Sequence, residues 1–571
     1  MSQEPKPSEN LKKISPLVFA LIIWGLVCAR QMGHAPAPAP SVAAPSAAVP
    51  ATPAQAGPES APETHAAPAP AAANNVIFMI GDGMGLQQVS QAVLYRQLRK
   101  TEDPELGLEK LMKEHVSGLM RTSSFGEIVT DSAAAATAMA CGQKALNESV
   151  GLDPNGFPCE TVLEKAAKLG KATGLVSTTR ITHATPAGFA GHQVFRDMES
   201  EIADDMIEKH DIDVLLSGGI SFLIPKYKDE ASKEPMKASD LPECSGLDAS
   251  IDGKSRREDQ KNLIAEASAR GMVFICKNEQ LEQLNVGPNT KVLGLFGASV
   301  FPMIQERRQI PTIPTLAALT QKALDILDKK KNGFFVMIEG GLIDYAGHDN
   351  DAGTMLQETL DFDASVRVAM DYVDKHPDTL LIVTADHETG GFGFAYGKSP
   401  GYEATLTSGV HYHKPYDFAA FEKFDLLVNQ KKSFRAILDP IVKKLYPKEV
   451  EAKTPPYTME TAVQNLLAEV KANTAYQMTP EQAQTILARK PGASDAEPED
   501  FADFYVHSSI HPDMMGRQVA SQNHAVWAAG THTSTPVVVM AMGAPRYAER
   551  VKGFIDNTDI AKIIDDALNN R

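Results

Sequence analysis

The sequence predicts an α/β fold with a large, mostly parallel central sheet and helices on both of its faces. Short apolar runs alternate with helix-like stretches along most of the chain, a pattern typical of strands that are buried on both sides. The runs stop at polar loops, several of which contain Asp, Glu or His. The chain has 571 residues, 43% of them hydrophobic, and this is enough for a large buried core.

Five apolar runs are predicted to be strands of this sheet. The first, residues 76–80 (VIFMI), stops abruptly at Gly81-Asp82-Gly83, as a buried strand does at a loop. The others are residues 174–176 (GLV), 334–338 (FFVMI), 380–383 (LLIV) and 536–542 (PVVVMAM). Helices are predicted between them at residues 161–169, 316–329 and 355–373.

One folded domain, residues 74–571, is predicted to contain two insertions. Residues 221–289 are polar and irregular. Residues 396–522 hold aromatic and amphipathic segments, such as 459–472 (METAVQNLLAEVKA). We expect the second insertion to form a cap or crown beside the functional site.

The N-terminus is predicted to be an export signal followed by a linker. Lys12 and Lys13 precede the apolar run 17–29, so residues 1–29 are expected to be a signal peptide or an N-terminal anchor. The run is short for a membrane span, which favours cleavage. If it is not cleaved, residues 14–29 would tether the protein to a membrane. Residues 30–73 are rich in Ala and Pro and are expected to be a disordered linker. This organisation predicts a periplasmic or extracellular protein.

Charge and cysteine content narrow the range of partners. The formal net charge of −17 argues against nucleic-acid binding, because a phosphate backbone would be repelled. A phosphate-bearing substrate would need a local source of positive charge, for which metal ions are the obvious candidates. Four cysteines follow residue 29, and in an oxidising compartment they could form two disulfides in any of three connectivities: Cys141, Cys159, Cys244 and Cys276.

Acidic residues and histidines gather where the predicted strands end. In a parallel sheet these ends lie at one edge, which is where such folds bind ligands. Nitrogen and carboxylate ligands together suit zinc, whereas oxygen ligands alone suit magnesium. The sequence therefore predicts a metal site formed by these residues: Asp82, Glu339, Asp344, His348, Asp386, His387 and His532.

Ser132 is the candidate nucleophile. It precedes the alanine-rich run 133–140, which has a strong helix propensity. Asp131 or Ser132 could simply cap this helix, but a serine at a helix N-terminus also meets free N–H groups and a positive dipole, which together favour phosphate. Ser132 does not lie in a Gly-x-Ser-x-Gly motif, so activation by a metal is the simpler account.

Six segments together resemble the alkaline phosphatase family, in that family's order: residues 80–85 (IGDGMG), 130–134 (TDSAA), 183–187 (HATPA), 339–344 (EGGLID), 384–391 (TADHETGG) and 531–533 (THT). They extend from residue 75 to the final predicted strand. The resemblance implies an alkaline phosphatase-like fold, a phosphoserine formed on Ser132, two zinc ions and one magnesium ion.

The resemblance also implies a role for each site residue. Asp344, His348 and His532 would hold one zinc, and Asp82, Asp386 and His387 the other, with Ser132 completing its shell. Asp82 would also reach the magnesium, together with Thr185 and Glu339. Arg196 matches the family arginine that grips two phosphate oxygens, a task that suits its planar charged group. Asp131 and Ser132 would adjoin the bound phosphate.

The sequence also varies from the family pattern. His183 stands where some bacterial members carry an aspartate near the magnesium, and Tyr345 stands where others carry lysine or histidine. The stretch between His387 and His532 is long for the family. These differences leave the affinity for magnesium and the pH optimum open.

The expected substrates are small phosphate monoesters, and the resemblance suggests a homodimer. A phosphodiesterase or nucleotide pyrophosphatase of the same superfamily is the nearest alternative, and Thr185, Glu339, Ser132 and Arg196 argue against it. A sulfatase is disfavoured because the Cys/Ser-x-Pro-x-Arg context is missing. A phosphate-scavenging surface protein that has lost catalysis would lack a ligand or the nucleophile, and the sequence retains them all.

Overall fold

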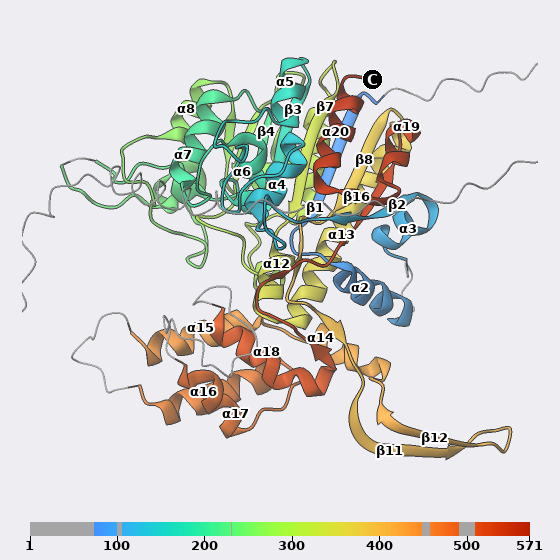
Figure 1. Cartoon of the computed structure of the whole chain (residues 1–571). Coiled ribbons are helices and arrows are strands. Elements are labelled where there is room, and N and C mark those ends of the chain that lie inside the picture. Colours follow the sequence, from blue (N-terminus) through green and yellow to red (C-terminus); the bar gives the residue numbers. More distant parts are fainter. Residues whose placement is uncertain (1–72, 100–104, 230, 448–456, 490–508, 571) are drawn as a thin grey trace, which may run out of the picture. The chain divides into compact units, whose positions relative to one another are not determined.

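The computed structural model describes residues 73–99, 105–229, 231–447, 457–489 and 509–570. These residues build a ten-stranded sheet with β1 in its interior (Figure 1). Neighbouring strands are parallel, except that β15 is antiparallel to both of its neighbours. The strands are, across the sheet, β16 (Gly553–Asp556), β2 (Val116–Arg121), β15 (Val537–Met542), β8 (Thr379–Thr384), β1 (Asn75–Gly81), β7 (Phe334–Gly340), β3 (Ala172–Arg180), β4 (Val214–Gly218), β6 (Val292–Leu295) and β5 (Val273–Ile275).

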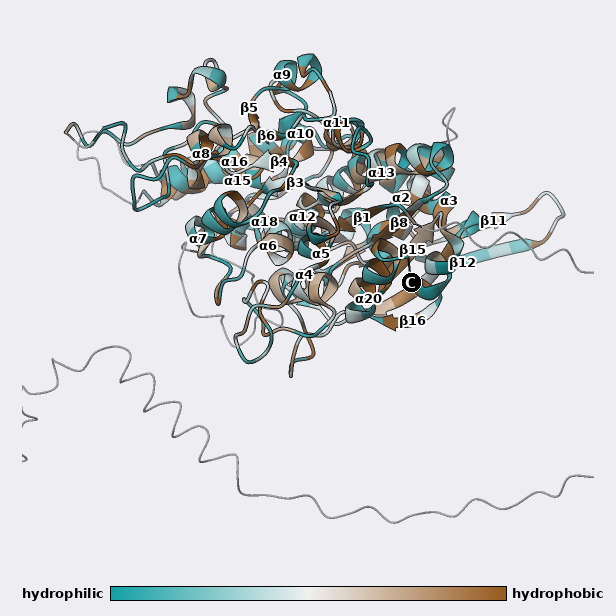
Figure 2. Cartoon of the chain, turned by 90° about the horizontal axis from the view of Figure 1, so that it is seen from above, coloured by the Kyte–Doolittle hydropathy of each residue, from teal (hydrophilic) through white to brown (hydrophobic). Residues whose placement is uncertain are grey.

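Helices cover the sheet on both faces, as the sequence predicts. One group contains α11 (Leu316–Leu327) and α13 (Ala352–Lys375), which contact each other and the central strands. The other contains α4 (Ser132–Cys141), α5 (Val162–Lys168), α6 (Ala184–Ala190) and α20 (Asn557–Leu568). Figure 2 shows the two groups on opposite sides of the strands. Strands β1, β7 and β8 are therefore completely buried, which explains why they are continuous apolar runs.

The predicted elements are confirmed, but two strands continue further than their apolar runs. Strand β3 extends to Arg180, so Ser177, Thr178 and Thr179 lie within the strand and not in a loop after it. Strand β7 likewise includes Glu339. Ser177 and Glu339 pair with each other across the two strands, and Glu339 also pairs with Ile80 of β1. Polar side chains within a buried strand need partners, and the site described below supplies them.

The segment 221–289 contributes to the sheet itself. It contains short helices, among them α8 (Leu263–Ala269) and α9 (Asn278–Gln283), and also β5, which pairs with β6 as an edge strand. A disulfide joins Cys244 to Cys276 within it. A second disulfide joins Cys141, at the end of α4, to Cys159. The structure thus selects one of the three connectivities.

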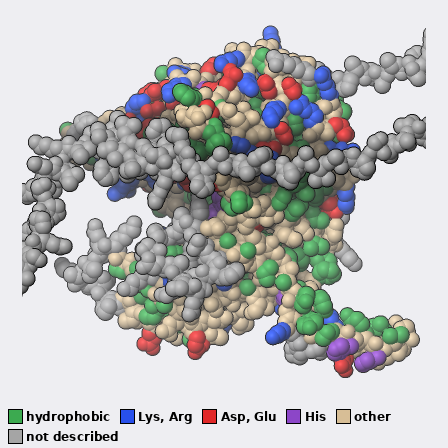
Figure 3. All heavy atoms as spheres, viewed as in Figure 1, with side chains coloured by type: hydrophobic (Ala, Val, Ile, Leu, Met, Phe, Trp, Pro, Cys, Tyr) green, Lys and Arg blue, Asp and Glu red, His purple; other side chains and the backbone are tan. Residues whose placement is uncertain are grey.

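The segment 396–522 divides into an arm and a helical subdomain in its described parts. The arm is the antiparallel hairpin of β11 (Gly397–Thr405) and β12 (His411–Asp417). It exposes Tyr402, Tyr412 and Tyr416, and Figure 3 shows hydrophobic and His side chains along it. The helices have a small hydrophobic core of their own: α15 (Phe434–Leu445), α16 (Met459–Asn473), α17 (Pro480–Ala488) and α18 (Ile510–Asn523).

The predicted signal peptide or anchor, residues 1–29 with the tether at 14–29, lies outside the described residues, as does the linker 30–73 except for Ala73. In the part of the chain that the structure describes, no helix combines the length and the apolar character that a membrane crossing needs.

Candidate active site

The structure brings the predicted metal ligands together at the carboxyl edge of the sheet. Asp82 directly follows β1, Glu339 lies at the end of β7, and Asp386 and His387 follow β8. The short helix α12 (Leu342–His348), which begins just after β7, carries Asp344 and His348. His532 belongs to β14 (His532–Thr533), which pairs with β9 (Glu388–Thr389) next to His387. The carboxylates and His348 and His387 are buried almost completely.

Asp344, His348 and His532 form the first of three ligand groups. Nδ1 of His348 donates to the Gly530 carbonyl at 2.7 Å, and Nδ1 of His532 donates to the Thr130 carbonyl at 2.9 Å. In the neutral tautomers that these bonds favour, the lone pairs are on the Nε2 atoms, which lie 3.1 Å apart. Asp344 Oδ2 lies 3.2 Å from His348 Nε2. Three electron-pair donors therefore converge, which is the arrangement that a cation requires.

The second group surrounds His387. Its Nε2 lies 3.2 Å from Asp386 Oδ2, 3.5 Å from Asp82 Oδ1 and 3.0 Å from Ser132 Oγ. Asp82, Asp344 and His387 each place a ligand atom within 4.8 Å of the others. Asp344 is thus shared between the two groups, so they are immediate neighbours.

The third group is richer in oxygen and contains Asp82, His183 and Glu339. Glu339 Oε2 accepts hydrogen bonds from Ser177 and from Thr179, the latter at 3.1 Å. Among the described residues, Glu339 Oε1, both Asp82 oxygens and Thr185 Oγ1 are buried without a hydrogen bond. Buried oxygens without partners are rare, and a hard cation at this point would satisfy them.

The site has an excess of negative charge. Burial, and then the charges of Asp386 and Asp344, raise the pKa of Asp82 well above its usual range. Burial, and then Asp344, raise the pKa of Asp386 to about 7, and burial also raises the pKa of Glu339. Burial acts in the same direction on Asp344, but the neighbouring His348 and His532 outweigh it and lower its pKa. Bound cations would offset this repulsion, so the residues present fit metal ions.

Ser132 is the first residue of α4, and Asp131 is the N-cap of that helix. Asp131 Oδ1 accepts from the Ala134 amide at 2.9 Å, and its Oδ2 accepts from Arg196 Nη1 at 3.0 Å. Arg196 Nη2 lies 3.3 Å from His183 Nε2. Burial, and then the charge of Arg196, lower the pKa of His183, so its neutral ring can accept from the arginine. The serine and the arginine are thus held at the same end of α4.

Some residues of the site are not predicted from the sequence. Thr389 Oγ1 donates to Asp344 Oδ1 at 2.5 Å and lies 3.3 Å from His387 Nδ1, so it links two ligands. Its place in the same motif as Asp386 and His387 could have identified it. Ser177 and Thr179 orient Glu339, and the run of polar residues 177–179 at the end of an otherwise apolar strand was the available signal.

A cleft of about 1250 Å³ borders the site at Tyr345. The segment 221–289 contributes Arg256 to its walls, and the segment 396–522 contributes Lys431 and Arg435. The Tyr345 ring lies 6.1 Å from that of His183, centroid to centroid. The two inserted segments therefore both line the cleft beside Tyr345.

The family model for alkaline phosphatase matches residues 73–570. The chain belongs to the alkaline phosphatase family. Alkaline phosphatase 3 of Bacillus subtilis (strain 168) is 31% identical over 510 residues, which are 86% of this chain and 88% of that protein. The crystal structure of Thermus thermophilus alkaline phosphatase has a TM-score of 0.69 at 27% identity and covers 88% of this chain and 92% of its own.

A second solved structure, the cold-active alkaline phosphatase from the psychrophile Shewanella sp., has a TM-score of 0.62 at 28% identity, over 86% of this chain and 99% of its own. The sequence-based assignment of fold and family is therefore confirmed. As an alkaline phosphatase family member, the chain is a metal-dependent hydrolase that acts on phosphate monoesters, and the clusters above are its candidate metal-binding groups.

Proposed function

We propose that this phosphatase works through a covalent phosphoserine on Ser132, supported by two zinc ions and one magnesium ion. One observation carries the proposal: Ser132 Oγ lies 3.0 Å from His387 Nε2, in a buried cluster of carboxylates and imidazoles at the N-terminus of α4. No Ser-His-Asp relay is needed to account for this serine, because the adjoining side chains are those of a metal site.

The donor chemistry assigns the metals. The groups with imidazole nitrogen, Asp344 with His348 and His532, and Asp82 with Asp386 and His387, suit zinc. Asp82, Glu339 and Thr185 suit magnesium, with His183 behind them, because most of their donor atoms are oxygens. When bound, these cations would lower the pKa of oxygen groups next to them and offset the negative charge of a transferring phosphoryl group.

The side chains of the protein account for the binding and orientation of the substrate. Arg196 pairs with two phosphoryl oxygens through its planar donors, and Asp131 holds the guanidinium in place. The α4 N-terminus directs its positive end to the same group. Ser132 Oγ forms a bond to phosphorus as the bond to the alcohol oxygen breaks, and water later hydrolyses the phosphoserine. Burial of the cluster excludes bulk water from the carboxylates.

The test compares Ser132→Ala with Ser365→Ala, a buried serine on α13 that bonds Thr320. Both variants and the wild type would be assayed with p-nitrophenyl phosphate and bis-p-nitrophenyl phosphate from pH 5 to 11. Chelator would be added first, and zinc and magnesium would then be restored.

We expect a preference for the monoester at alkaline pH, lost with chelator and with Ser132→Ala and retained in Ser365→Ala. Mass spectrometry of the acid-quenched wild type should find one phosphoryl group on Ser132. Turnover that survives Ser132→Ala would refute the phosphoserine, and a preference for the diester would indicate a phosphodiesterase.

We also propose that the protein is exported to the periplasm or beyond the cell. The apolar run after Lys12 and Lys13 supports this, and the two disulfides are consistent with an oxidising compartment. Cell fractionation of the full-length chain tests it, and activity confined to the cytoplasm would contradict it.

A further inference from the structure

Glu164, His192 and His210 form a second cluster that shares no residue with the catalytic groups. Glu164 lies on α5, His192 follows α6, and His210 is the C-cap of the π-helix η2 (Asp205–Lys209). Each contributes one ligand atom, and these atoms all lie within 4.8 Å of one another. The side chains are mostly shielded from solvent, with exposed fractions of 14% for His192, 19% for Glu164 and 12% for His210.

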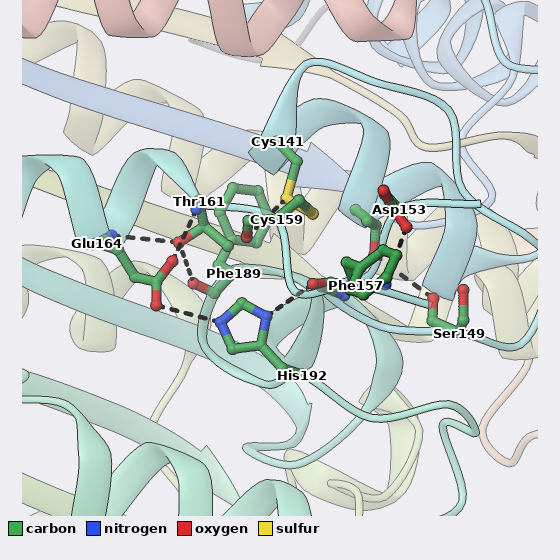
Figure 4. Close-up of a disulfide and its surroundings, with 11 residues drawn as sticks. Cys141, Ser149, Asp153, Phe157, Cys159, Thr161, Glu164, Phe189 and His192 are labelled. Carbon is green, nitrogen blue, oxygen red and sulfur yellow. Dashed lines mark hydrogen bonds and ion pairs between the residues drawn. A yellow bond between two sulfur atoms is a disulfide. The ribbon is translucent and has the colours of Figure 1, made fainter. Parts of the chain in front are cut away.

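Neighbouring groups orient two of these side chains towards each other. His192 Nδ1 donates to the Gly151 carbonyl at 2.7 Å, so in the neutral ring Nε2 carries the lone pair. That Nε2 lies 3.1 Å from Glu164 Oε1. The other oxygen, Oε2, accepts from the Thr161 amide at 2.8 Å in the capping box of α5. Figure 4 shows the His192 ring turned towards the Glu164 carboxylate. A lone pair thus faces a carboxylate, an arrangement that needs positive charge.

His210 completes the cluster. Its Nδ1 lies 4.0 Å from the same Glu164 Oε1. Its Nε2 is buried and has no hydrogen-bond partner among the residues that the structure describes. Burial lowers the pKa of His210, which favours the neutral ring, and the tautomer with its proton on Nε2 leaves a lone pair on Nδ1, the atom nearest Glu164. This second imidazole distinguishes the cluster from an ordinary histidine–carboxylate pair.

We propose that Glu164, His192 and His210 bind a divalent transition metal, zinc being the best match, at a site separate from the catalytic centre. Two imidazoles and a carboxylate are a frequent zinc ligand set, with water in the fourth position. Zinc–ligand distances of about 2.0–2.1 Å place neighbouring ligands about 3.3 Å apart. The 3.1 Å separation already matches this value, and the 4.0 Å separation would have to shorten by about 0.7 Å. The Gly151 carbonyl and the Thr161 amide are the outer partners that typically orient metal ligands.

The site would tie together three segments close to the catalytic residues in sequence. Only three residues separate His192 from Arg196. One of them, Gln193, forms a β-bridge with Val150. The Cys141–Cys159 disulfide joins the end of α4 to the start of this region (Figure 4). A metal here would therefore stabilise the loop that presents Arg196, without contacting substrate.

A proton is the alternative source of positive charge. Burial lowers the pKa of His192, but the hydrogen bond that the protonated ring donates to Glu164, with the other nearby acceptors and charges, outweighs it, and the pKa is raised. An imidazolium at His192 would balance the charge of Glu164. It would not explain why His210 lies in the same cluster. Metal content therefore separates the two explanations.

The experiment measures zinc per chain by inductively coupled plasma mass spectrometry, after gel filtration of the full chain loaded with zinc and magnesium. His210→Asn and Glu164→Gln remove one ligand each. His376→Asn is the matched control, because His376 lies 3.5 Å from Asp328 without a second histidine in that pair. We expect both ligand variants to lose one zinc equivalent relative to the wild type, and the control to lose none.

Equal zinc content in the wild type and in folded ligand variants would overturn the proposal and leave an imidazolium–carboxylate pair. If a variant does not fold, crystals of the wild type decide the question. Anomalous difference maps collected above and below the zinc absorption edge should contain a peak between the three side chains. The absence of that peak, with peaks present at the catalytic clusters, would overturn the proposal without affecting the proposed phosphoserine.

Discussion

Asp131 connects the helix that carries Ser132 to the arginine that we propose to grip phosphate. One of its carboxylate oxygens caps α4 through the Ala134 amide, and the other accepts from Arg196. Asp131→Asn should separate these roles, because Asn caps helices about as well as Asp but carries no charge. Asp131→Ala should abolish both.

The magnitude follows from the two contacts. The charged hydrogen bond between Arg196 and Asp131 contributes about 2 kcal/mol. Asn has a single acceptor oxygen, so while that oxygen caps α4 its NH2 group faces Arg196, and this tether on Arg196 is lost. Because a loosened Arg196 must be ordered again when phosphate binds, the inhibition constant for inorganic phosphate should rise about 25-fold. Asp131→Ala should raise it to a similar extent and also lose about 1 kcal/mol of capping energy.

Competitive inhibition by phosphate at saturating metal measures the first effect, and urea unfolding measures the second. Asp556 provides a matched control, since it caps α20 and pairs with Arg121 at 2.7 Å in the same way. Asp556→Asn should alter stability and leave the inhibition constant unchanged. If phosphate binds more tightly to Asp131→Asn than to the wild type, repulsion between Asp131 and phosphate outweighs the tether, and the reasoning is wrong.

Three further predictions concern stability. Replacing Cys244 and Cys276 with Ser should lower the free energy of unfolding by about 4 kcal/mol, from the chain entropy of a loop with a sequence separation of 32; an unchanged urea midpoint would contradict this. Arg307→Met should cost about 3–5 kcal/mol, because it leaves the buried Glu358 without its partner at 3.1 Å; a loss below about 1 kcal/mol in urea unfolding would argue against it. Burial raises the pKa of Asp363 to about 6 from 3.8, so the folded state keeps its proton to higher pH than the unfolded chain, and stability is lost as the pH rises from about 4 to 6. Asp363→Asn should remove about 3 kcal/mol of that loss, and a difference in unfolding free energy that does not change with pH would refute this.

The sequence predicts five of the ten strands, among them the central ones, because strands buried on both faces must be largely apolar. For the same reason it predicts where Asp82 and Asp386 lie, since each comes within three residues of the end of such a run. It does not predict that β5 joins the sheet, because a three-residue edge strand carries almost no hydrophobic pattern.

Contacts between residues far apart in the chain are also beyond what the sequence pattern predicts. Thr389 acts by touching Asp344, and this depends on how α12 packs against the loop after β8. The cluster of Glu164, His192 and His210 likewise has no spacing typical of a metal motif, since three separate segments converge only in the folded chain. The cysteine pairing depends in the same way on folded distances.

The distribution of the ligands along the chain determines when activity can first appear. Asp82 comes from the first strand and His532 from a short strand just before β15, yet His532 lies 3.5 Å from Asp344, which Thr389 also contacts. The ribosome synthesises these residues in order, so a chain that ends before His532 lacks one of the side chains of the cluster. Such long-range contacts form late in folding. Unfinished or truncated chains should therefore be inert towards the phosphate esters of the cell that makes them.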